Sequence, residues 1–371
     1  MKKFFYLLLI VMTATEAPAQ QFNLLIGTYT HGGKSEGIYS YRFTAARDSF
    51  SYMRQGVTKL SDPSYLCVSP DQRFVYAVTE GSEEKSAVSA FKFDKKNGTL
   101  LFLNKALTNA EAPCFVTANR HHVITANYGG GSLSVFGRSE SGKLTDLKQQ
   151  LQHTGKGIDA KKRQESAHVH MVRFTPDKKF LLATDLGEDH IYVYRYDKTA
   201  ERPLSVKSVV KTTAGTGPRH LTFSPNGRFA YLVHEFNGSV SAYRYRNGEL
   251  DLLQQITTID AGFRGNVDAA DIHVSPDGKF LYETNRGDAN SISVFSIGND
   301  GRLTFVQRIS TKGKGPRNFV IDPTGNYVLV AHQYTDNVVI FRRDKTTGLL
   351  TDMKSEIKVG APVCLVFTPV R

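Results

Sequence analysis

A two-strand pattern recurs along the chain at a near-constant interval. In each copy a short apolar strand runs into a Pro-Asp-Gly-like turn and a second strand follows, as in the stretch 217–235. The turn residues are separated by 49, 57, 49, 51, 47 and 46 positions: Pro70, Asn119, Pro176, Pro225, Pro276, Pro323 and Pro369. Self-similarity at such a period is typical of folds built from repeated supersecondary units, so the repeat constrains the architecture more than the length does.

Each unit carries two further strands. After 217–235 comes an alternating segment at 239–245, then an Asn-Gly turn at 247–248 and a weaker strand at 250–257. Alternation with a period of two, with dense Val, Tyr, Phe and Thr, favours strands over helices. Four antiparallel strands in about 50 residues are typical of a β-propeller blade, so the repeat predicts an all-β fold.

The two ends of the chain complete one blade between them. The last unit stops after a single strand at 361–371, whereas the strand-like segments 22–30 and 37–44 lack a first strand of their own. Joining them closes the ring and removes the free sheet edge. Six or eight blades would leave a fragment over. The sequence therefore predicts a seven-bladed β-propeller, with N- and C-terminal strands sharing one blade, as a single domain over residues 20–371.

The first residues have the composition of a secretory signal peptide. Lys2 and Lys3 give a basic start, residues 4–12 form a short apolar run, and small residues at 17–19 suit cleavage. We expect a signal peptide at 1–19 and an exported, periplasmic protein; an uncleaved anchor is the alternative. The rest of the chain holds no run of the length that spans a bilayer, so we expect no membrane association after cleavage.

Charge and cysteine content narrow the function classes. The net charge is +12, or +10 without Lys2 and Lys3, but Lys and Arg are spread evenly, which argues against nucleic acid as a partner. A positive field that attracts small anions fits better, with plain solubility as the simpler explanation. Cys67, Cys114 and Cys364 fall in apolar strand segments and are expected to be small buried residues. A Cys67–Cys364 disulfide is compatible with an oxidising compartment but not required.

Polar side chains gather where the blades meet the channel. The start of a blade's first strand and the end of its second lie at the same end of a propeller channel. Strand-one starts supply His168, His170, Arg219, His220, Asp271, His273, Arg317 and Asn318. Strand-two ends supply Glu80, Asn127, Asp185, His234, Glu235, Asn285, Arg286, His332 and Gln333. So many Arg, His and carboxylate groups exceed what solvating a channel requires, so we expect a binding site at this mouth.

At these residues the chain resembles a known family. The lactonase family of seven-bladed propellers includes bacterial 6-phosphogluconolactonases and the fungal carboxy-cis,cis-muconate cyclase. The resemblance covers essentially the whole chain after the leader. It is carried by IGTYT, SEGIY, HVH at 168–170, GPRHLTFSPNGRFAYLVHE, IHVSPDGKFLYETNRG and GKGPRNFVIDPTGN. The chain departs from the family at Glu283, where a small residue is usual and which could face the channel or a neighbouring blade.

The resemblance implies a catalytic set and a chemistry. The catalytic residues would be His170, Arg219, Glu235 and Arg286. Glu235 or His170 would activate water, and the two arginines would bind an oxyanion or an anionic substrate group. The expected substrate-binding residues are His168, His220, His234, Arg317 and Gln333.

Simpler explanations stand beside these roles. Arg219 and Glu235 could form a purely structural ion pair, and Asp271 and His273 are expected to be structural. The two imidazoles of the 168–170 motif could approach a metal. No third ligand at fixed spacing is evident and the resembled family works without metal, so we expect neither metal nor cofactor.

The leading functional hypothesis is an enzyme that hydrolyses a sugar lactone. The resembled family points to 6-phosphogluconolactone, but an exported protein would not meet a cytoplasmic sugar phosphate. An unphosphorylated aldonolactone, or another small anionic lactone, is therefore a credible substrate. The alternatives are a lactone-forming cycloisomerase of the muconate cyclase type and a non-catalytic propeller that binds an anionic ligand or protein. The sequence leaves the oligomeric state and the direction of reaction open.

Overall fold

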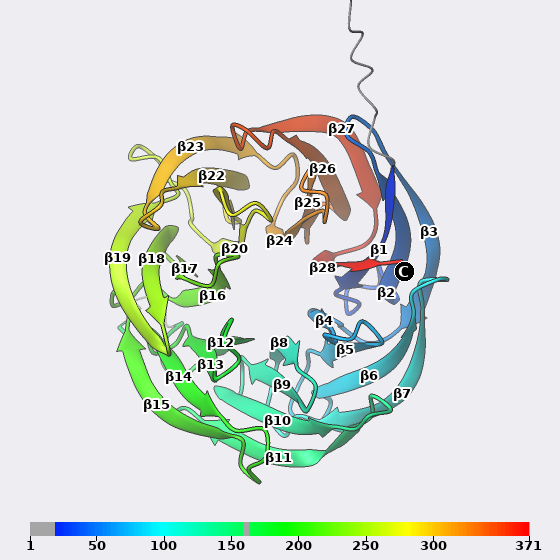
Figure 1. The fold of residues 1–371 in the computed structure, drawn as a ribbon, viewed down its shortest axis with the longest axis vertical. Coiled ribbons are helices and arrows are strands. Elements are labelled where there is room, and N and C mark those ends of the chain that lie inside the picture. The colour runs from blue at the N-terminus through cyan, green and yellow to red at the C-terminus, as the bar shows by residue number, and fades with distance from the viewer. Residues whose placement is uncertain (1–18, 159–162, 371) are drawn as a thin grey trace, which may run out of the picture.

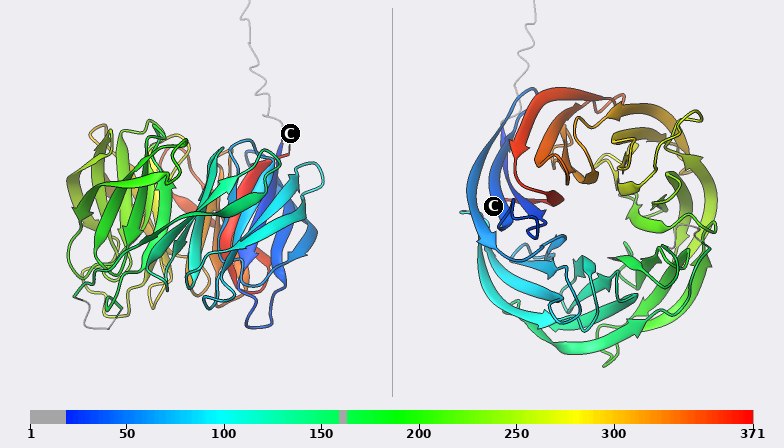
Figure 2. Two further views of the ribbon diagram at one scale, coloured as in Figure 1. Left: turned by 90° about the horizontal axis from the view of Figure 1, so that it is seen from below. Right: turned by 180° about the vertical axis from the view of Figure 1, so that it is seen from behind.

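The structure is a computed structural model that describes residues 19–158 and 163–370. The expected signal peptide, except for residue 19, lies outside the described residues. Seven four-stranded antiparallel sheets stand around a central axis (Figure 1). Side and rear views show a short cylinder with the connections between strands collected at its two ends (Figure 2). The described residues contain no helix with the length and hydropathy of a membrane span.

The strands occupy four concentric positions. The innermost are β4 (Leu66–Val68), β8 (Pro113–Ala118), β12 (Val169–Phe174), β16 (Pro218–Phe223), β20 (Ala269–Val274), β24 (Pro316–Ile321) and β28 (Pro362–Pro369). The second are β1 (Gln20–Thr28), β5 (Phe74–Thr79), β9 (His122–Asn127), β13 (Phe180–Asp185), β17 (Phe229–His234), β21 (Phe280–Asn285) and β25 (Tyr327–His332). The third are β2 (Gly37–Ala45), β6 (Ala87–Asp94), β10 (Ser132–Arg138), β14 (His190–Tyr196), β18 (Ser239–Arg246), β22 (Ser291–Ile297) and β26 (Asn337–Arg343). The outermost are β3 (Phe50–Lys59), β7 (Thr99–Leu107), β11 (Leu144–Gln152), β15 (Leu204–Lys211), β19 (Glu249–Thr257), β23 (Leu303–Ser310) and β27 (Leu350–Lys358).

One blade contains both ends of the described chain. Its strand order is β28-β1-β2-β3, so the last strand is its innermost member. Leu25 of β1 pairs with Val366 on one side and with Ser40 on the other. In Figure 1 the red β28 lies against the blue β1. The predicted seven-bladed ring and its closure are confirmed.

The hydrophobic core lies between the blades. Buried aromatic and branched side chains from neighbouring sheets pack in successive clusters around the ring. A repeated contact joins three pairs of blades: the hydroxyls of Tyr76, Tyr231 and Tyr282 each donate to a glycine carbonyl in the next blade, at 2.8–3.1 Å. These glycines have positive φ, and a Cβ on them would collide with a phenylalanine ring. The tight blade packing gives the channel a rigid frame.

Candidate active site

β-Bulges place the polar residues at one end of the channel, which we call the front end. In six blades the pairing of the innermost strand shifts by one residue just after the strand begins. The residues within these shifts are Cys114, His170, Arg219 with His220, Ala270 with Asp271, Arg317, and Val363. A bulge leaves a residue out of the ladder and re-aims its side chain, as often happens beside active sites. Each of these blades therefore presents a side chain that regular pairing would direct elsewhere.

The front end contains a small pocket of about 240 Å³, which we call the front pocket. It is lined by Tyr29, Glu80, Cys114, Tyr128, Arg163, His170, Glu235, Arg286 and Arg317. These residues come from starts of innermost strands, from ends of second strands and from the β11–β12 connection. The prediction that such positions converge at one mouth is therefore confirmed for Glu80, His170, Glu235, Arg286 and Arg317.

Glu235 is the negative centre of the front pocket. Arg163 donates from Nη2 to its Oε1 at 2.6 Å. Arg219 Nε and Arg286 Nη2 lie 2.7 and 3.2 Å from its Oε2, both as ion pairs without hydrogen-bond geometry. Arg286 also donates to Asp268 at 3.0 Å. Burial raises the pKa of Glu235, but Arg286, Arg219 and Arg163 outweigh it and hold that pKa well below its usual value. The carboxylate is thus ionised and fully engaged.

Arg219 supports Glu235 without lining the pocket. It is almost fully buried and also donates from Nη1 to the Ala270 carbonyl. Burial, with the nearby charge of Arg286, lowers the pKa of Arg219 to about 10, so the guanidinium keeps its proton at neutral pH. Removing one partner of such a buried pair is strongly destabilising, because the other charge is left uncompensated.

His170 has a different environment. Its ring packs edge-on against Tyr128 and His220, with centroids 5.5 and 5.2 Å away. Its Nδ1 lies 3.8 Å from Cys114 Sγ, and within the described chain no hydrogen-bond partner faces its Nε2. Burial, with Arg219 and His220, lowers the pKa of His170 well below its usual value. The imidazole is therefore neutral at pH 7 and can accept a proton at Nε2.

Arg317 forms the opposite wall. Its guanidinium lies over the Tyr29 ring, 5.5 Å from the centroid, and Tyr29 donates to Glu80 at 3.0 Å. Burial lowers the pKa of Arg317, but Tyr29, Glu80 and Glu235 outweigh it and raise the pKa. Among residues 19–158 and 163–370 it has no ion pair or hydrogen bond through its guanidinium. An unpaired guanidinium in a pocket is suited to an incoming anion.

The other predicted substrate-binding residues do not line the front pocket. His168 stacks on Tyr128, with centroids 4.5 Å apart. His220 lies behind His170 and bonds from Nδ1 to Asp271 at 2.8 Å. His234 is fully buried, and its ring nitrogens bond to Thr216 and Ser241. Gln333 is also absent from the lining. Because side chains alternate at a strand end, Glu235 reaches the pocket and His234 turns into the blade.

Two further predictions are resolved by burial and bonding. Asp271 is buried, and its carboxylate accepts hydrogen bonds from Asn318 and two backbone amides and also bonds to His220 and His273, which fits the expected structural role. Glu283 is fully buried on the same face of β21 as Leu281, so it faces the preceding blade and not the channel. Neither of its oxygens has a hydrogen-bond partner in the described structure, and burial raises the pKa of Glu283 to about 8.

Several pocket residues escaped the sequence reasoning. Tyr29, Cys114, Tyr128 and Arg163 were not proposed as site residues, although Tyr29 lies in the IGTYT motif. The unusually long interval of 57 residues between two turns could have pointed to Arg163, because the extra residues form the β11–β12 connection that contains it. The three cysteines are free, with Cys114 and Cys364 buried as expected and Cys67 partly buried; the Cys67–Cys364 disulfide is absent.

Two other polar sites lie outside the front pocket. His153, Asp185 and Glu188 bring metal-ligand atoms within 4.8 Å of one another. These atoms are engaged in hydrogen bonds within the protein: His153 to Asp185 and Tyr194 at 2.6 Å each, and Glu188 to Tyr192 at 2.5 Å.

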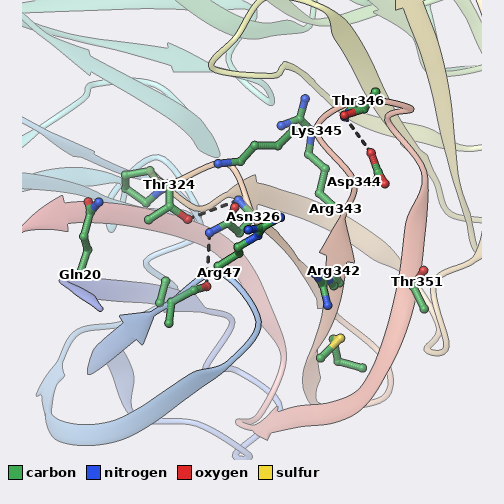
Figure 3. Close-up of a pocket in the computed structure, with 14 residues that line it drawn as sticks. Gln20, Arg47, Thr324, Asn326, Arg342, Arg343, Asp344, Lys345, Thr346 and Thr351 are labelled. Atoms are coloured by element: carbon green, nitrogen blue, oxygen red, sulfur yellow. Dashed lines mark hydrogen bonds between the residues drawn. The ribbon is translucent and has the colours of Figure 1, made fainter. Parts of the chain in front are cut away.

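A hollow of about 920 Å³ lies at the opposite, rear end, between the first and last blades (Figure 3). This hollow is larger than the front pocket, but its Arg342 and Arg343 are paired with Asp48 and Asp277. It therefore lacks a convergent set of reactive groups.

Comparison with known proteins identifies the family. The family model described as lactonase, 7-bladed beta-propeller, matches residues 23–367. The chain belongs to this lactonase family. It is 38% identical over 347 residues to the 6-phosphogluconolactonase of Bacillus subtilis, covering 92% of this chain and 97% of that one. Among solved structures of similar proteins is a putative 6-phosphogluconolactonase from Bacteroides fragilis, with a TM-score of 0.90, 43% identity, and coverage of 94% of this chain and 98% of that one. The periplasmic gluconolactonase of Pseudomonas aeruginosa has a TM-score of 0.89 and 38% identity, covering 95% and 100%.

Proposed function

We propose that the protein hydrolyses a small sugar lactone in the front pocket. The observation that carries this proposal is that two available groups line the same cavity. One is the neutral His170, whose Nε2 is open, and the other is Arg317, whose guanidinium has no ion pair or hydrogen bond within the described residues. A volume of about 240 Å³ is below the ~300–1,000 Å³ usual for drug-sized ligands, and suits one sugar ring. Membership of the lactonase family and its 6-phosphogluconolactonase relatives support the same reaction.

His170 is the better candidate for the general base. Both oxygens of Glu235 are engaged by arginines, and its low pKa makes it a poor proton acceptor. In the proposed reaction His170 Nε2 takes a proton from water as the water oxygen attacks the lactone carbonyl carbon. The carbonyl becomes an oxyanion, the ring C–O bond breaks, and the leaving alkoxide takes the proton back from the imidazolium.

The arginines would divide the remaining tasks. Arg286 lines the pocket and could stabilise the oxyanion, while Glu235 limits its movement. Arg317 would bind an anionic or electron-rich substituent of the sugar. Arg219 would act as a positioning residue that holds Glu235, because it is buried beneath the pocket.

The compartment bears on the substrate. The leader-like first residues support export, and one similar structure is a periplasmic gluconolactonase. We therefore propose a periplasmic protein and favour an unphosphorylated aldonolactone, with the phosphorylated lactone as the alternative suggested by the Bacillus subtilis relative.

The test compares glucono-δ-lactone and 6-phosphogluconolactone with purified protein, in assays corrected for spontaneous opening. Wild type is expected to accelerate at least one lactone, with Glu235→Gln and Arg219→Ala much reduced. Arg244→Gln, on the exposed part of β18, is the control and should match wild type. No acceleration of either lactone, or full activity in both site variants, would sink the proposal.

A further inference from the structure

A second cavity opens at the rear end of the channel, where the hairpin turns lie. It has a volume of about 780 Å³ and lies against three consecutive blades, from β4 to β14, with part of β28. Its walls are mainly apolar, with Tyr65, Phe115, Phe174, Val366 and Phe367 among them. Phe115 is buried, and the other four side chains are partly exposed. We call this space the rear cavity.

The charge of the rear cavity has one sign. Four basic residues line it: Arg120, Arg173, Lys178 and Lys198. No Asp or Glu belongs to its lining. Arg173 is the most enclosed of the four, since it is partly buried on β12 whereas the others are exposed. In the described part of the chain, none of these four side chains has an ion pair or hydrogen bond.

This combination differs from the arginine-rich sites elsewhere in the molecule. In the front pocket three guanidinium groups surround Glu235, and at the rear hollow of Figure 3 two pair with aspartates. A half-buried guanidinium among apolar side chains loses hydration without gaining a protein partner. An anionic group on a ligand would supply the missing partner, and the aromatic walls would bury its apolar body.

We propose that the rear cavity binds a small organic anion with an aromatic or alkyl body, the anionic group lying on Arg173. The four basic residues complement the anion, and the apolar walls discriminate against a plain inorganic ion. This site is separate from the lactone site. A layer of rings lies between them: Tyr65 and Phe115 stack at 4.0 Å, and both contact His220 edge-on.

Matched dyes test the proposal directly. Anilinonaphthalene sulfonate carries an aromatic body and a sulfonate, while N-phenyl-1-naphthylamine has the same rings without the charge. Fluorescence titration of the full chain should show saturable binding of the sulfonate, and binding of the neutral dye weaker by about tenfold or more, the scale of a charge-assisted hydrogen bond. Equal affinity for the two dyes, or no saturable binding, overturns the proposal.

Variants locate the site. Arg173→Gln should weaken binding of the sulfonate dye by about tenfold, whereas Arg173→Lys should retain most of it. Arg244→Gln makes the same change in net charge on an exposed strand and should bind as wild type does. Arg317→Gln controls for dye in the front pocket. Thermal melting of each variant verifies folding. If Arg173→Gln binds like wild type, if Arg173→Lys binds no better than the Gln variant, or if either control loses as much as Arg173→Gln, the proposal is wrong.

Discussion

Arg163 and Glu235 are 72 positions apart and come from different blades, yet Arg163 Nη2 lies 2.6 Å from Glu235 Oε1. Arg163 also lies over the ring of Phe236, 4.7 Å from its centroid, and its side chain is 39% exposed. It therefore connects the buried arginine–glutamate cluster with the open side of the pocket. The substrate would meet this guanidinium before it reached Glu235.

We expect Arg163→Gln to lower kcat/KM by at least about tenfold, because Glu235 loses the cation on Oε1. If Arg163 orients both Glu235 and the substrate, the fall in kcat/KM should appear mainly as a higher KM. Steady-state kinetics on the better lactone measure it, with Arg244→Gln as the charge-matched control. An unchanged kcat/KM would show that this contact has no part in the reaction.

His170→Asn is expected to lower kcat by about 10²–10⁴-fold with a small change in KM, as for loss of a general base. The pH profile is a second readout. As the proposed general base, His170 would act as the neutral imidazole, and burial with Arg219 and His220 lowers the pKa of His170. Activity should therefore persist as the pH falls below 6.5 and decline only in more acid solution. An acid limb at or above pH 6.5 would contradict this assignment.

Arg317→Gln should discriminate between substrates. Without the unpaired guanidinium, KM for 6-phosphogluconolactone should rise by about tenfold or more, and KM for uncharged glucono-δ-lactone should rise less. Arg317→Lys keeps the charge without the two-pronged geometry and should fall between wild type and the Gln variant. Equal effects on the two lactones would place the anionic group elsewhere.

Glu283 predicts a pH dependence of stability that is independent of catalysis. Its pKa is raised by burial from 4.5 to about 8, so the unfolded chain loses this proton at a lower pH than the folded chain does. The contribution of Glu283 to the free energy of unfolding is therefore fully present below about pH 4.5, falls as the pH rises toward 8, and is constant above it. Glu283→Gln removes this term, so its thermal midpoint should gain on wild type between pH 5 and 8. A constant difference between the two midpoints over that range would refute it.

The fold was predictable because each blade repeats its own turn chemistry. The turn spacing and the incomplete first and last units determined the number of blades and the closure by β28. The convergence of His170, Glu235, Arg286 and Arg317 followed from the antiparallel geometry of a blade. These features depend on local pattern and on strand direction, which a single sequence records.

Other parts of the site depend on geometry that a single sequence does not record. The bulge at His170 has no residue signature, so which residue leaves the ladder was not evident. His234 precedes Glu235, and their opposite orientations depend on where β17 ends. Arg163 reaches Glu235 from another blade, a contact set by the course of a connection. A connection of that length has many conformations compatible with its sequence.

The closure of the ring by β28 also determines when the fold can be completed. Among the described strands β28 comes last in the sequence, yet it pairs with β1, which comes first, so β1 keeps an open edge until β28 is in place. The first blade is therefore the one most exposed to strand exchange with another copy, and any binding factor that shields the β1 edge would act before β28 pairs with it.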